Sequence, residues 1–270
     1  MRSYFFPFSF CLKIVFLCMF ASSGVRSRMK LKVILAWSVH LYTALGLVTA
    51  ACMSVLIVRG GDDSFRAALG LMVLATLIDS TDGWLARRAR VNEFAPSFDG
   101  RRLDDLIDFQ TYTSLPLLLV WRAGILTDGQ AWLLIIPLLS SAYGFSQVNA
   151  KTDDGFFLGF PSYWNIVAFY LYLLRPPIWF SLTIIIALSI LTFVPWRYLY
   201  TSQRAPFSLL TNLLATIWVI LLLMSLARVP DSDWPLLISL AFPVYYMLMS
   251  WALTLRLRRN RRSTTIVKST

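Results

Sequence analysis

Four aspartates in the first half of the chain have the spacing of a shared binding site. Asp79 and Asp82 are three residues apart, and Asp104 and Asp108 are four residues apart. Since residues three or four apart lie on one face of an α-helix, each pair would point in one direction. Apolar segments of membrane-spanning length flank all four, and a carboxylate at the edge of hydrocarbon is costly. We therefore expect these aspartates to have a function.

The chemistry of such a cluster is set by its charge. Two helices packed side by side would direct four carboxylates at one point, where they would repel one another without a counter-charge. Hard divalent cations such as Mg²⁺ and Mn²⁺ bind oxygen ligands and often bridge the phosphates of a substrate. Two metal ions in one carboxylate cluster are typical of phosphoryl chemistry. The spacing therefore predicts a site for Mn²⁺ or Mg²⁺, with two ions, but it does not distinguish a metal ligand from a general base.

Two residues beside the first pair suit a phosphate ligand. Gly83 has no side chain, so a ligand could approach the backbone next to Asp82. Arg87 lies five residues after Asp82, and its guanidinium can form two parallel hydrogen bonds to phosphate oxygens. Asp105, by contrast, would point about 100° away from Asp104 on a helix, so we expect it not to bind the metal.

The region resembles the signature of the CDP-alcohol phosphatidyltransferases, which reads Asp-x2-Asp-Gly-x2-Ala-Arg, a gap, and then Gly-x3-Asp-x3-Asp. All eight fixed positions are present, as Asp79, Asp82, Gly83, Ala86, Arg87, Gly100, Asp104 and Asp108. The gap has twelve residues, whereas eight is commonest in that family. The longer gap and the run from Gly159 to Tyr170 resemble the branch that contains the bacterial phosphatidylcholine synthases.

The resemblance implies an activity and a role for each acid. An enzyme of this branch condenses CDP-diacylglycerol with choline, giving phosphatidylcholine and CMP. By resemblance, Asp79, Asp82 and Asp104 are metal ligands. Asp108 is the general base, which accepts the proton of the alcohol, and it also touches a metal. Relatives in this family commonly form homodimers through their spans, so a homodimer is a further expectation.

The resemblance also implies contacts with the nucleotide. Gly83 and Arg87 would contact the CDP group. Many members of the family have Asn-x-x-Thr in the first span, facing the nucleotide. Thr43 matches that pattern, whereas His40 stands in place of the asparagine. Thr43 is therefore the candidate nucleotide contact in the first span.

Aromatic residues are candidates for binding choline, whose quaternary ammonium has no hydrogen to donate. Aromatic faces attract such a cation. Tyr112 lies one helical turn beyond Asp108, and Tyr163, Trp164 and Tyr170 lie near or within a later apolar segment. Aromatic residues are also common at membrane interfaces without any ligand, which is the alternative for each of them.

Two alternative functions remain open. One is the same chemistry with glycerol 3-phosphate, serine or inositol as acceptor, and Arg101 and Arg102 could serve an anionic acceptor. The other is a transporter whose acids carry ions. Transporters more often show repeats and broken helices near mid-membrane. Here the acids cluster at one end of two consecutive apolar segments, which favours the enzyme.

The composition is that of an integral membrane protein. The 270 residues are 57% hydrophobic and only 14% charged, whereas about a quarter of a soluble domain is charged. The net charge is +11, but the basic residues lie mainly at the ends of apolar segments. That placement is typical of membrane topology and contact with anionic lipids, so we expect no nucleic-acid partner.

Counting about twenty residues per crossing, we predict an all-α polytopic bundle of about eight transmembrane helices. The predicted spans are 34–58, 66–87, 103–122, 130–148, 161–174, 177–194, 207–227 and 234–255.

The distribution of basic residues predicts the orientation. Arg26–Lys32, the loop from Arg87 to Arg102 and the tail Arg256–Arg262 are rich in arginine and lysine. With eight spans all three fall on one side, which the positive-inside rule makes cytoplasmic. We therefore expect a multi-pass protein of the bacterial inner membrane, with the active site and both termini facing the cytoplasm.

Two segments are expected along the chain. Residues 1–28 read as an N-terminal extension or a mis-assigned start, because Met29 directly precedes the first good span. Residues 29–270 would form a single CDP-alcohol phosphatidyltransferase membrane domain.

Overall fold

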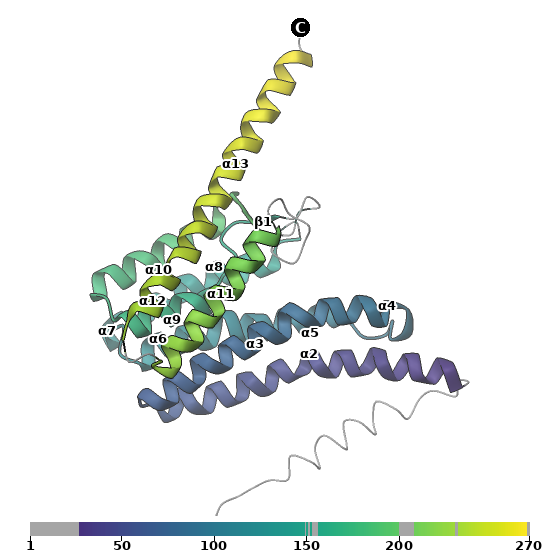
Figure 1. Ribbon diagram of the computed structural model, residues 1–270, viewed down its shortest axis with the longest axis horizontal. Helices are drawn as coiled ribbons and strands as arrows, with labels where there is room; N and C mark the ends of the chain where they lie inside the picture. The colour runs from purple at the N-terminus through teal and green to yellow at the C-terminus, as the bar shows by residue number, and fades with distance from the viewer. Residues whose placement is uncertain are drawn as a thin grey trace, which may run out of the picture.

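The computed structural model describes residues 27–148, 150, 152, 156–199, 208–229 and 232–268. The extension predicted for residues 1–28 lies, except for its last two residues, outside this part of the chain. The described residues are mainly helical, as the sequence predicts (Figure 1).

The elements follow one another in this order: α2 (Ser27–Arg59), α3 (Asp62–Ala89), α4 (Val91–Phe94), α5 (Gly100–Asp108), the π-helix η1 (Phe109–Ser114), α6 (Leu115–Arg122), α7 (Asp128–Ala131), the 3-10 turn η2 (Trp132–Leu134), α8 (Ile135–Ser146), β1 (Phe156–Leu158), α9 (Trp164–Leu174), α10 (Ile178–Phe193), β2 (Arg197–Leu199), α11 (Ser208–Ala227), α12 (Trp234–Ser239) and α13 (Ala241–Lys268).

The long helices α2 and α3 form an antiparallel hairpin (Figure 1). The turn between them consists of Gly60 and Gly61, with φ of 74° and 87°. Only glycine adopts these angles without steric cost, so this pair of residues allows the chain to reverse within two positions. The hairpin is the base on which the first half of the chain packs.

A short connection leads from α3 back to α5. Arg90 ends α3 in the left-handed conformation, with φ of 50°, and its amide donates to carbonyls of the last turn of α3. At the start of α5, the carboxylate of Asp99 accepts a hydrogen bond from the amide of Arg102 at 3.2 Å. This cap satisfies one of the free amides at the helix start. α5 then packs against α2 and continues through the π-helix into α6.

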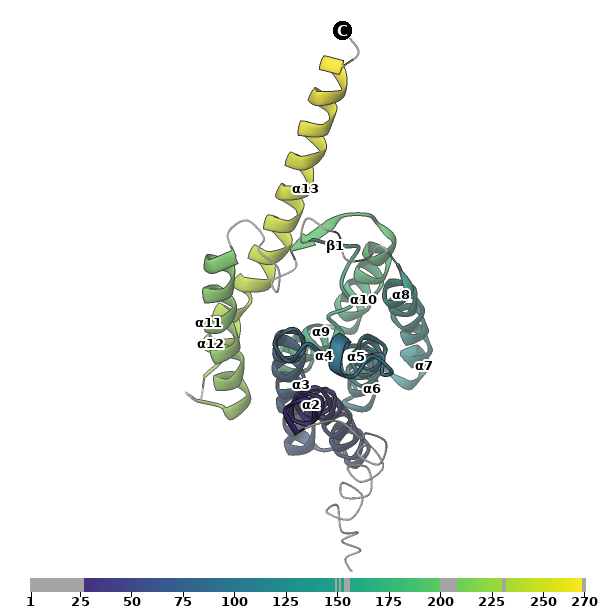
Figure 2. The ribbon, with the colours of Figure 1, turned by 90° about the vertical axis from the view of Figure 1, so that its right-hand side faces the viewer.

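Helix α9 lies at the centre of the core. Trp164 is fully buried, and its Nε1 donates to Oγ of Ser141 on α8 at 2.7 Å. Asn165 donates from Nδ2 to Oγ1 of Thr76 on α3 at 3.2 Å. Ala168 and Phe169 are also buried. α9 thereby joins α3, α6 and α8 into one body (Figure 2).

Two short strands and the last helix form a further unit. β1 pairs antiparallel with β2, an element that the sequence did not predict. β2 in turn packs on α13: the amide of Leu199 donates to Oγ of Ser250 at 3.2 Å, and the amide of Arg197 donates to Oγ1 of Thr254 at 3.0 Å. Side-chain hydroxyls on α13 thus satisfy backbone groups of β2 that the strand pairing leaves open. The rest of α13 extends away from the other helices (Figures 1 and 2).

The structure supports a membrane protein but not eight spans. Four helices in the described part are long and apolar enough to cross a membrane, at Met29–Arg59, Asp62–Ala89, Leu209–Ala227 and Trp234–Arg256. Large apolar side chains on their outer faces are exposed, such as Val55 at 68% and Leu209 at 85%. Such surfaces are costly in water and are expected in contact with lipid.

The four other predicted spans fall on shorter or divided helices. The segment 103–122 changes from α- to π-hydrogen bonding at Phe109, and 130–148 contains two short turns before α8 begins. The segment 161–174 contains an 11-residue helix, and 177–194 a 16-residue helix. Apolar composition therefore predicted spans at segments whose helices in the described part of the chain are too short or too divided to be counted as membrane-spanning.

We predict that Gly159→Ala lowers the melting temperature of the detergent-solubilised protein by several degrees. Gly159 has a φ of 83°, and a Cβ there would lie 2.2 Å from the carbonyl oxygen of Thr192. Backbone cannot move aside as a side chain can, so the cost is on the order of 1–3 kcal/mol. Gly70→Ala, where a Cβ meets nothing within 4 Å, is the matched control. Equal melting temperatures for the two variants would contradict the prediction.

Candidate metal centre

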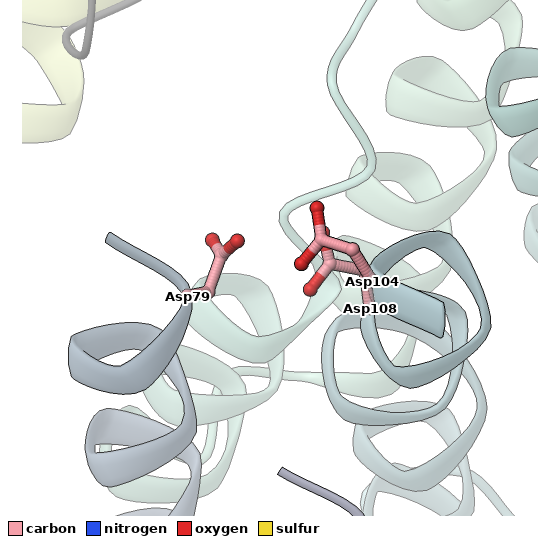
Figure 3. Close-up of side chains that lie close together, drawn as sticks. All are labelled: Asp79, Asp104 and Asp108. Carbon is pink, nitrogen blue, oxygen red and sulfur yellow. The ribbon is translucent and has the colours of Figure 1, made fainter. Parts of the chain in front are cut away.

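Three of the four predicted aspartates lie together (Figure 3). Asp79 comes from α3, and Asp104 and Asp108 come from one face of α5. One carboxylate oxygen of each lies within 4.8 Å of the others, and all three side chains are partly buried. Asp105 is not one of this group. Helical spacing thus predicted that Asp104 and Asp108 share one face of a helix, and the structure adds that α3 brings Asp79 to that face.

Tyr112 holds one of the carboxylates in place. Its hydroxyl donates to Oδ2 of Asp79 at 2.8 Å, which joins η1 to α3. Tyr112 is only 7% exposed, so water competes little for this bond. The π-helical turn that carries Tyr112 directly follows Asp108, and such turns are frequent at functional sites. The sequence indicated that Tyr112 lies near Asp108, but nothing in it indicated the bond to Asp79.

The fourth predicted aspartate, Asp82, has a different environment. It is 6% exposed, and its Oδ2 accepts a hydrogen bond from Oγ1 of Thr43 on α2 at 2.8 Å. At the preceding residue of each helix, the hydroxyls of Tyr42 and Thr81 are 2.7 Å apart. Asp82 does not belong to the group of three carboxylates, so its role as a metal ligand stays a prediction. Thr43, predicted to contact a nucleotide, here orients the carboxylate of Asp82.

Gly83 and Arg87 lie next to each other on α3. A Cβ built on Gly83 would be 3.5 Å from Nη1 of Arg87, so the guanidinium lies over the bare backbone of the glycine. Arg87 is exposed. An exposed guanidinium beside a position without a side chain can meet an anionic ligand, as the sequence predicted for both residues.

His40 explains the need for glycine at the start of α5. A Cβ on Gly100 would lie 2.7 Å from Cε1 of His40, and the ring of His40 packs against those of Phe98 and Trp37, at 4.6 and 5.8 Å between centroids. The Nε2 atom of this buried ring has no hydrogen-bond partner in the part of the chain that the structure describes. α5 can therefore approach α2 closely only because residue 100 has no side chain.

The predicted aromatic candidates divide into two groups. Tyr112 lies beside the carboxylates, and Tyr163 lies next to Tyr112, with ring centroids 6.3 Å apart. Trp164 is fully buried in the core, and the hydroxyl of Tyr170 is 2.8 Å from Oγ of Ser239. Trp164 and Tyr170 therefore stabilise the packing of helices and do not face the site.

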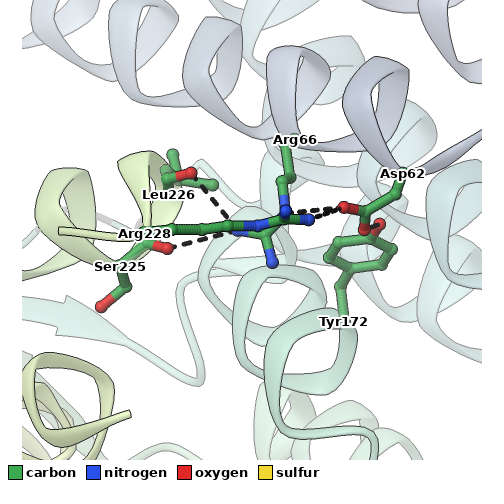
Figure 4. Close-up of polar contacts among 6 residues, drawn as sticks. All are labelled: Asp62, Arg66, Tyr172, Ser225, Leu226 and Arg228. Atoms are coloured by element: carbon green, nitrogen blue, oxygen red, sulfur yellow. Dashed lines mark hydrogen bonds and ion pairs between the residues drawn. The ribbon is translucent and has the colours of Figure 1, made fainter. Parts of the chain in front are cut away.

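A second polar cluster lies at the other end of α3 (Figure 4). Asp62 accepts hydrogen bonds from Tyr172 on α9, from Nε of Arg66 at 3.0 Å, and from Arg228 just after α11. Nη1 of Arg66 also donates to two carbonyl oxygens near the end of α11, at 3.2 and 3.3 Å. These groups satisfy one another and attach α11 to α3 and α9, so we assign this cluster a structural role.

The donor set of the first cluster suits a hard cation. Three carboxylates within 4.8 Å of one another offer only oxygen ligands, which Mg²⁺ and Mn²⁺ prefer and softer metals do not. A bound cation would also relieve the repulsion among the three negative charges. Together with the guanidinium of Arg87, the site could bind a phosphate ester and act on it with a carboxylate.

The chain is similar to several curated proteins of one name. It is 35% identical to phosphatidylcholine synthase of Pseudomonas aeruginosa over 208 residues, and this alignment covers 77% of this chain and 86% of the relative. It is 37% identical over 193 residues to phosphatidylcholine synthase of Bradyrhizobium diazoefficiens (71% of each chain). It is 34% identical to the phosphatidylcholine synthase of Borreliella burgdorferi over 177 residues, which are 64% of this chain and 73% of the relative. No family model matches the chain.

We predict that Gly100→Ala lowers the melting temperature and that His40→Ala, added to it, restores most of the loss. The new methyl group meets the His40 ring, which cannot turn away because Trp37 and Phe98 pack against it. Removing the ring makes room for the methyl group, so the two changes should be strongly non-additive. Gly129→Ala, where a Cβ meets nothing within 4 Å, is the control. Additive losses would contradict this packing.

Proposed function

The chain belongs to the family of phosphatidylcholine synthases, and from that premise we propose that it transfers the phosphatidyl group of CDP-diacylglycerol to choline at the carboxylate cluster of α3 and α5. One observation carries the placement of the reaction: Asp79, Asp104 and Asp108 converge within 4.8 Å. The names of the relatives support the product, and the convergence of the three carboxylates supports this location for the reaction.

The signature of the CDP-alcohol phosphatidyltransferases supports the same proposal. Its eight fixed residues lie on α3 and α5, the two helices that bring the carboxylates together. The twelve residues between Arg87 and Gly100 contain the left-handed turn at Arg90 and the short helix α4. The long gap is thus accommodated as a folded connection without disturbing the approach of the two helices.

We propose Asp79, Asp104 and Asp108 as the residues that hold the metal, Mn²⁺ or Mg²⁺, with Asp82 completing a site for two ions. When bound, the cations would neutralise negative charge on the phosphates of the substrate and on the leaving group. Tyr112 and Thr43 would keep the carboxylates of Asp79 and Asp82 oriented, because each donates a hydrogen bond at 2.8 Å.

The reaction forms one bond and breaks one bond at the same phosphorus. The hydroxyl oxygen of choline attacks the phosphorus that carries diacylglycerol, and the bond from that phosphorus to the bridging oxygen breaks. CMP leaves with the bridging oxygen and its electron pair. The hydroxyl proton passes to Asp108, which we propose as the general base because a carboxylate within hydrogen-bond reach can accept it.

The nucleotide part of the substrate would lie over the exposed end of α3. Arg87 can donate two hydrogen bonds to a phosphate, and the absence of a side chain at Gly83 leaves the backbone open. Thr43 would contribute to this part of the site indirectly, because its hydrogen bond orients the carboxylate of Asp82.

We propose that the site faces the cytoplasm of a bacterium and that the protein lies in the inner membrane. The arginines of the connection between α3 and α5 are at the same end as the site, and basic connections remain on the cytoplasmic side. CDP-linked substrates are also found there. A homodimer, which the resemblance implies, is a further expectation.

An acceptor panel tests the activity. Purified protein with CDP-diacylglycerol and Mn²⁺ or Mg²⁺ is mixed with choline, glycerol 3-phosphate, serine or inositol, and the lipid product is identified by mass spectrometry. We expect phosphatidylcholine and CMP with choline, and no CMP when the metal is removed by a chelator. A different lipid product would contradict the acceptor. No CMP with any acceptor, from folded protein, would contradict the reaction.

We predict that Asp104→Asn and Asp108→Asn each reduce CMP release at least a hundredfold. Each removes a negative charge from the cluster, and Asp108→Asn also removes the proton acceptor, which alone contributes about 10²–10⁴-fold. Asp105→Asn is the matched control, since its carboxylate is on the same helix but outside the group of three, and it should retain activity within a few-fold. Thermal melts of all three variants separate lost chemistry from lost folding.

A further inference from the structure

We propose that the ring faces of Tyr112, Tyr163 and Tyr246 form the site that holds the trimethylammonium group of choline. The proposal rests on the proposed function, and it names the residues that select the acceptor. It adds Tyr246 of α13, which lies 138 positions after Asp108 in the sequence. Together these three residues are called the tyrosine site.

The tyrosine site begins at the carboxylates. The hydroxyl of Tyr112 is 2.8 Å from Oδ2 of Asp79, and the helical turn that carries it directly follows Asp108. In choline a two-carbon linker joins the hydroxyl to the ammonium. An acceptor whose hydroxyl reaches Asp108 must therefore place its cationic group within a few ångströms of the carboxylates, where the ring of Tyr112 lies.

The other two rings continue from Tyr112. The centroid of Tyr163, just before α9, is 6.3 Å from that of Tyr112, with the ring planes tilted by 49°. It is 6.2 Å from the centroid of Tyr246, with a tilt of 60°. Because neither pair is stacked in parallel, the ring faces do not cover one another. Segments far apart in the sequence thus bring three rings into consecutive contact, and the first of these rings, Tyr112, bonds to Asp79 of the carboxylate cluster.

The chemistry of choline suits this site and few others. A quaternary ammonium has no N–H group, so it cannot be recognised by hydrogen bonds. It binds through cation–π attraction to aromatic faces and through methyl contacts with them. Glycerol 3-phosphate, serine and inositol have no quaternary ammonium. A site lined by aromatic ring faces would not replace the hydrogen bonds that their charged or hydroxyl groups make with water. The tyrosine site would therefore favour choline over the other acceptors.

The strand pair holds Tyr246 in position. Its hydroxyl donates to the carbonyl oxygen of Leu199 on β2 at 3.0 Å. Tyr198, the preceding residue on β2, stacks on its ring at 6.3 Å with a tilt of 25°. Tyr246 is 9% exposed, so packing also fixes its side chain. A ring that is fixed before the ligand arrives loses little conformational entropy on binding, which raises the affinity for the ligand.

The first test removes one ring face. Tyr163→Leu should raise the KM for choline by about 10- to 30-fold, the loss of a desolvated cation–π contact. The KM for CDP-diacylglycerol should be unchanged, because the nucleotide lies over α3. Tyr163→Phe keeps the ring and should stay within about threefold of the wild type. Tyr163 is partly exposed, so its replacement is the mildest of the three for folding.

A matched control comes from the residue before Tyr246 on α13. Tyr245 is adjacent to Tyr246, but its ring packs against Phe242 at 6.3 Å and its hydroxyl is 3.2 Å from Oγ1 of Thr211. Tyr245→Leu should leave the KM for choline unchanged, whereas Tyr246→Leu should raise it. Equal effects of the two changes would contradict the proposal, since a general loosening of α13 would then explain both.

The second test separates charge recognition from shape. In 3,3-dimethylbutan-1-ol a carbon atom replaces the nitrogen of choline, so the molecule has the same shape without the charge. We expect the wild type to prefer choline over this alcohol by at least tenfold in kcat/KM, and Tyr163→Leu to lose most of that preference. This ratio does not depend on how much enzyme is folded, so it can be measured on the active fraction of any variant.

The outcomes distinguish the two proposals. If the wild type releases no CMP with choline, the proposed function is wrong. If it uses choline, and Tyr163→Leu and Tyr246→Leu both retain the wild-type KM and the wild-type preference over the neutral alcohol, the proposed function stands and the tyrosine site is wrong.

Discussion

The structure depends on holding like charges close together at the edge of an apolar bundle. Two carboxylates about 4 Å apart repel each other by about 4 kcal/mol at an effective dielectric constant of about 20. Asp79, Asp104 and Asp108 lie within 4.8 Å, and they come from two different helices. Without opposing forces α3 and α5 would separate. The packing of the apolar helices supplies one such force, and a bound cation would supply the other.

The packing that opposes this repulsion depends on close approach of backbones. α2 contacts both α3 and α5, and two glycines mark where it meets α5. A Cβ on Gly46 would lie 2.6 Å from Ile107, and one on Gly100 would lie 2.7 Å from His40. At both points the helices are as near as their side chains allow. The hydrogen bond from Tyr112 to Asp79 then joins the two carboxylate-bearing segments directly.

The sequence predicted how residues a few positions apart are arranged, and it missed contacts between residues far apart in the chain. Asp104 and Asp108 lie on one face because helical geometry fixes residues four apart, and that can be read without a structure. The number of spans could not be read, since hydropathy counts apolar residues and does not show where helices break. Residues 161–174 are apolar, but the helix they contain has only 11 residues, most of which are buried against other helices. Nor could any pattern have shown that Tyr246 packs beside Tyr163, because the two are 83 residues apart.

The two parts of the proposed reaction thus lie on different elements. The carboxylates that would act on phosphate come from α3 and α5, which are close in sequence and both pack on α2. The rings that would select the acceptor come from η1, the start of α9 and α13, and β2 supports the last of these. Only Tyr112 belongs to both, through its hydroxyl and its ring face. Because the elements are separate, the surroundings of Tyr163 and Tyr246 can change the choice of alcohol while the carboxylates remain in place. On this proposal a short sequence signature would define the chemistry, whereas acceptor choice would depend on contacts that only the folded chain creates.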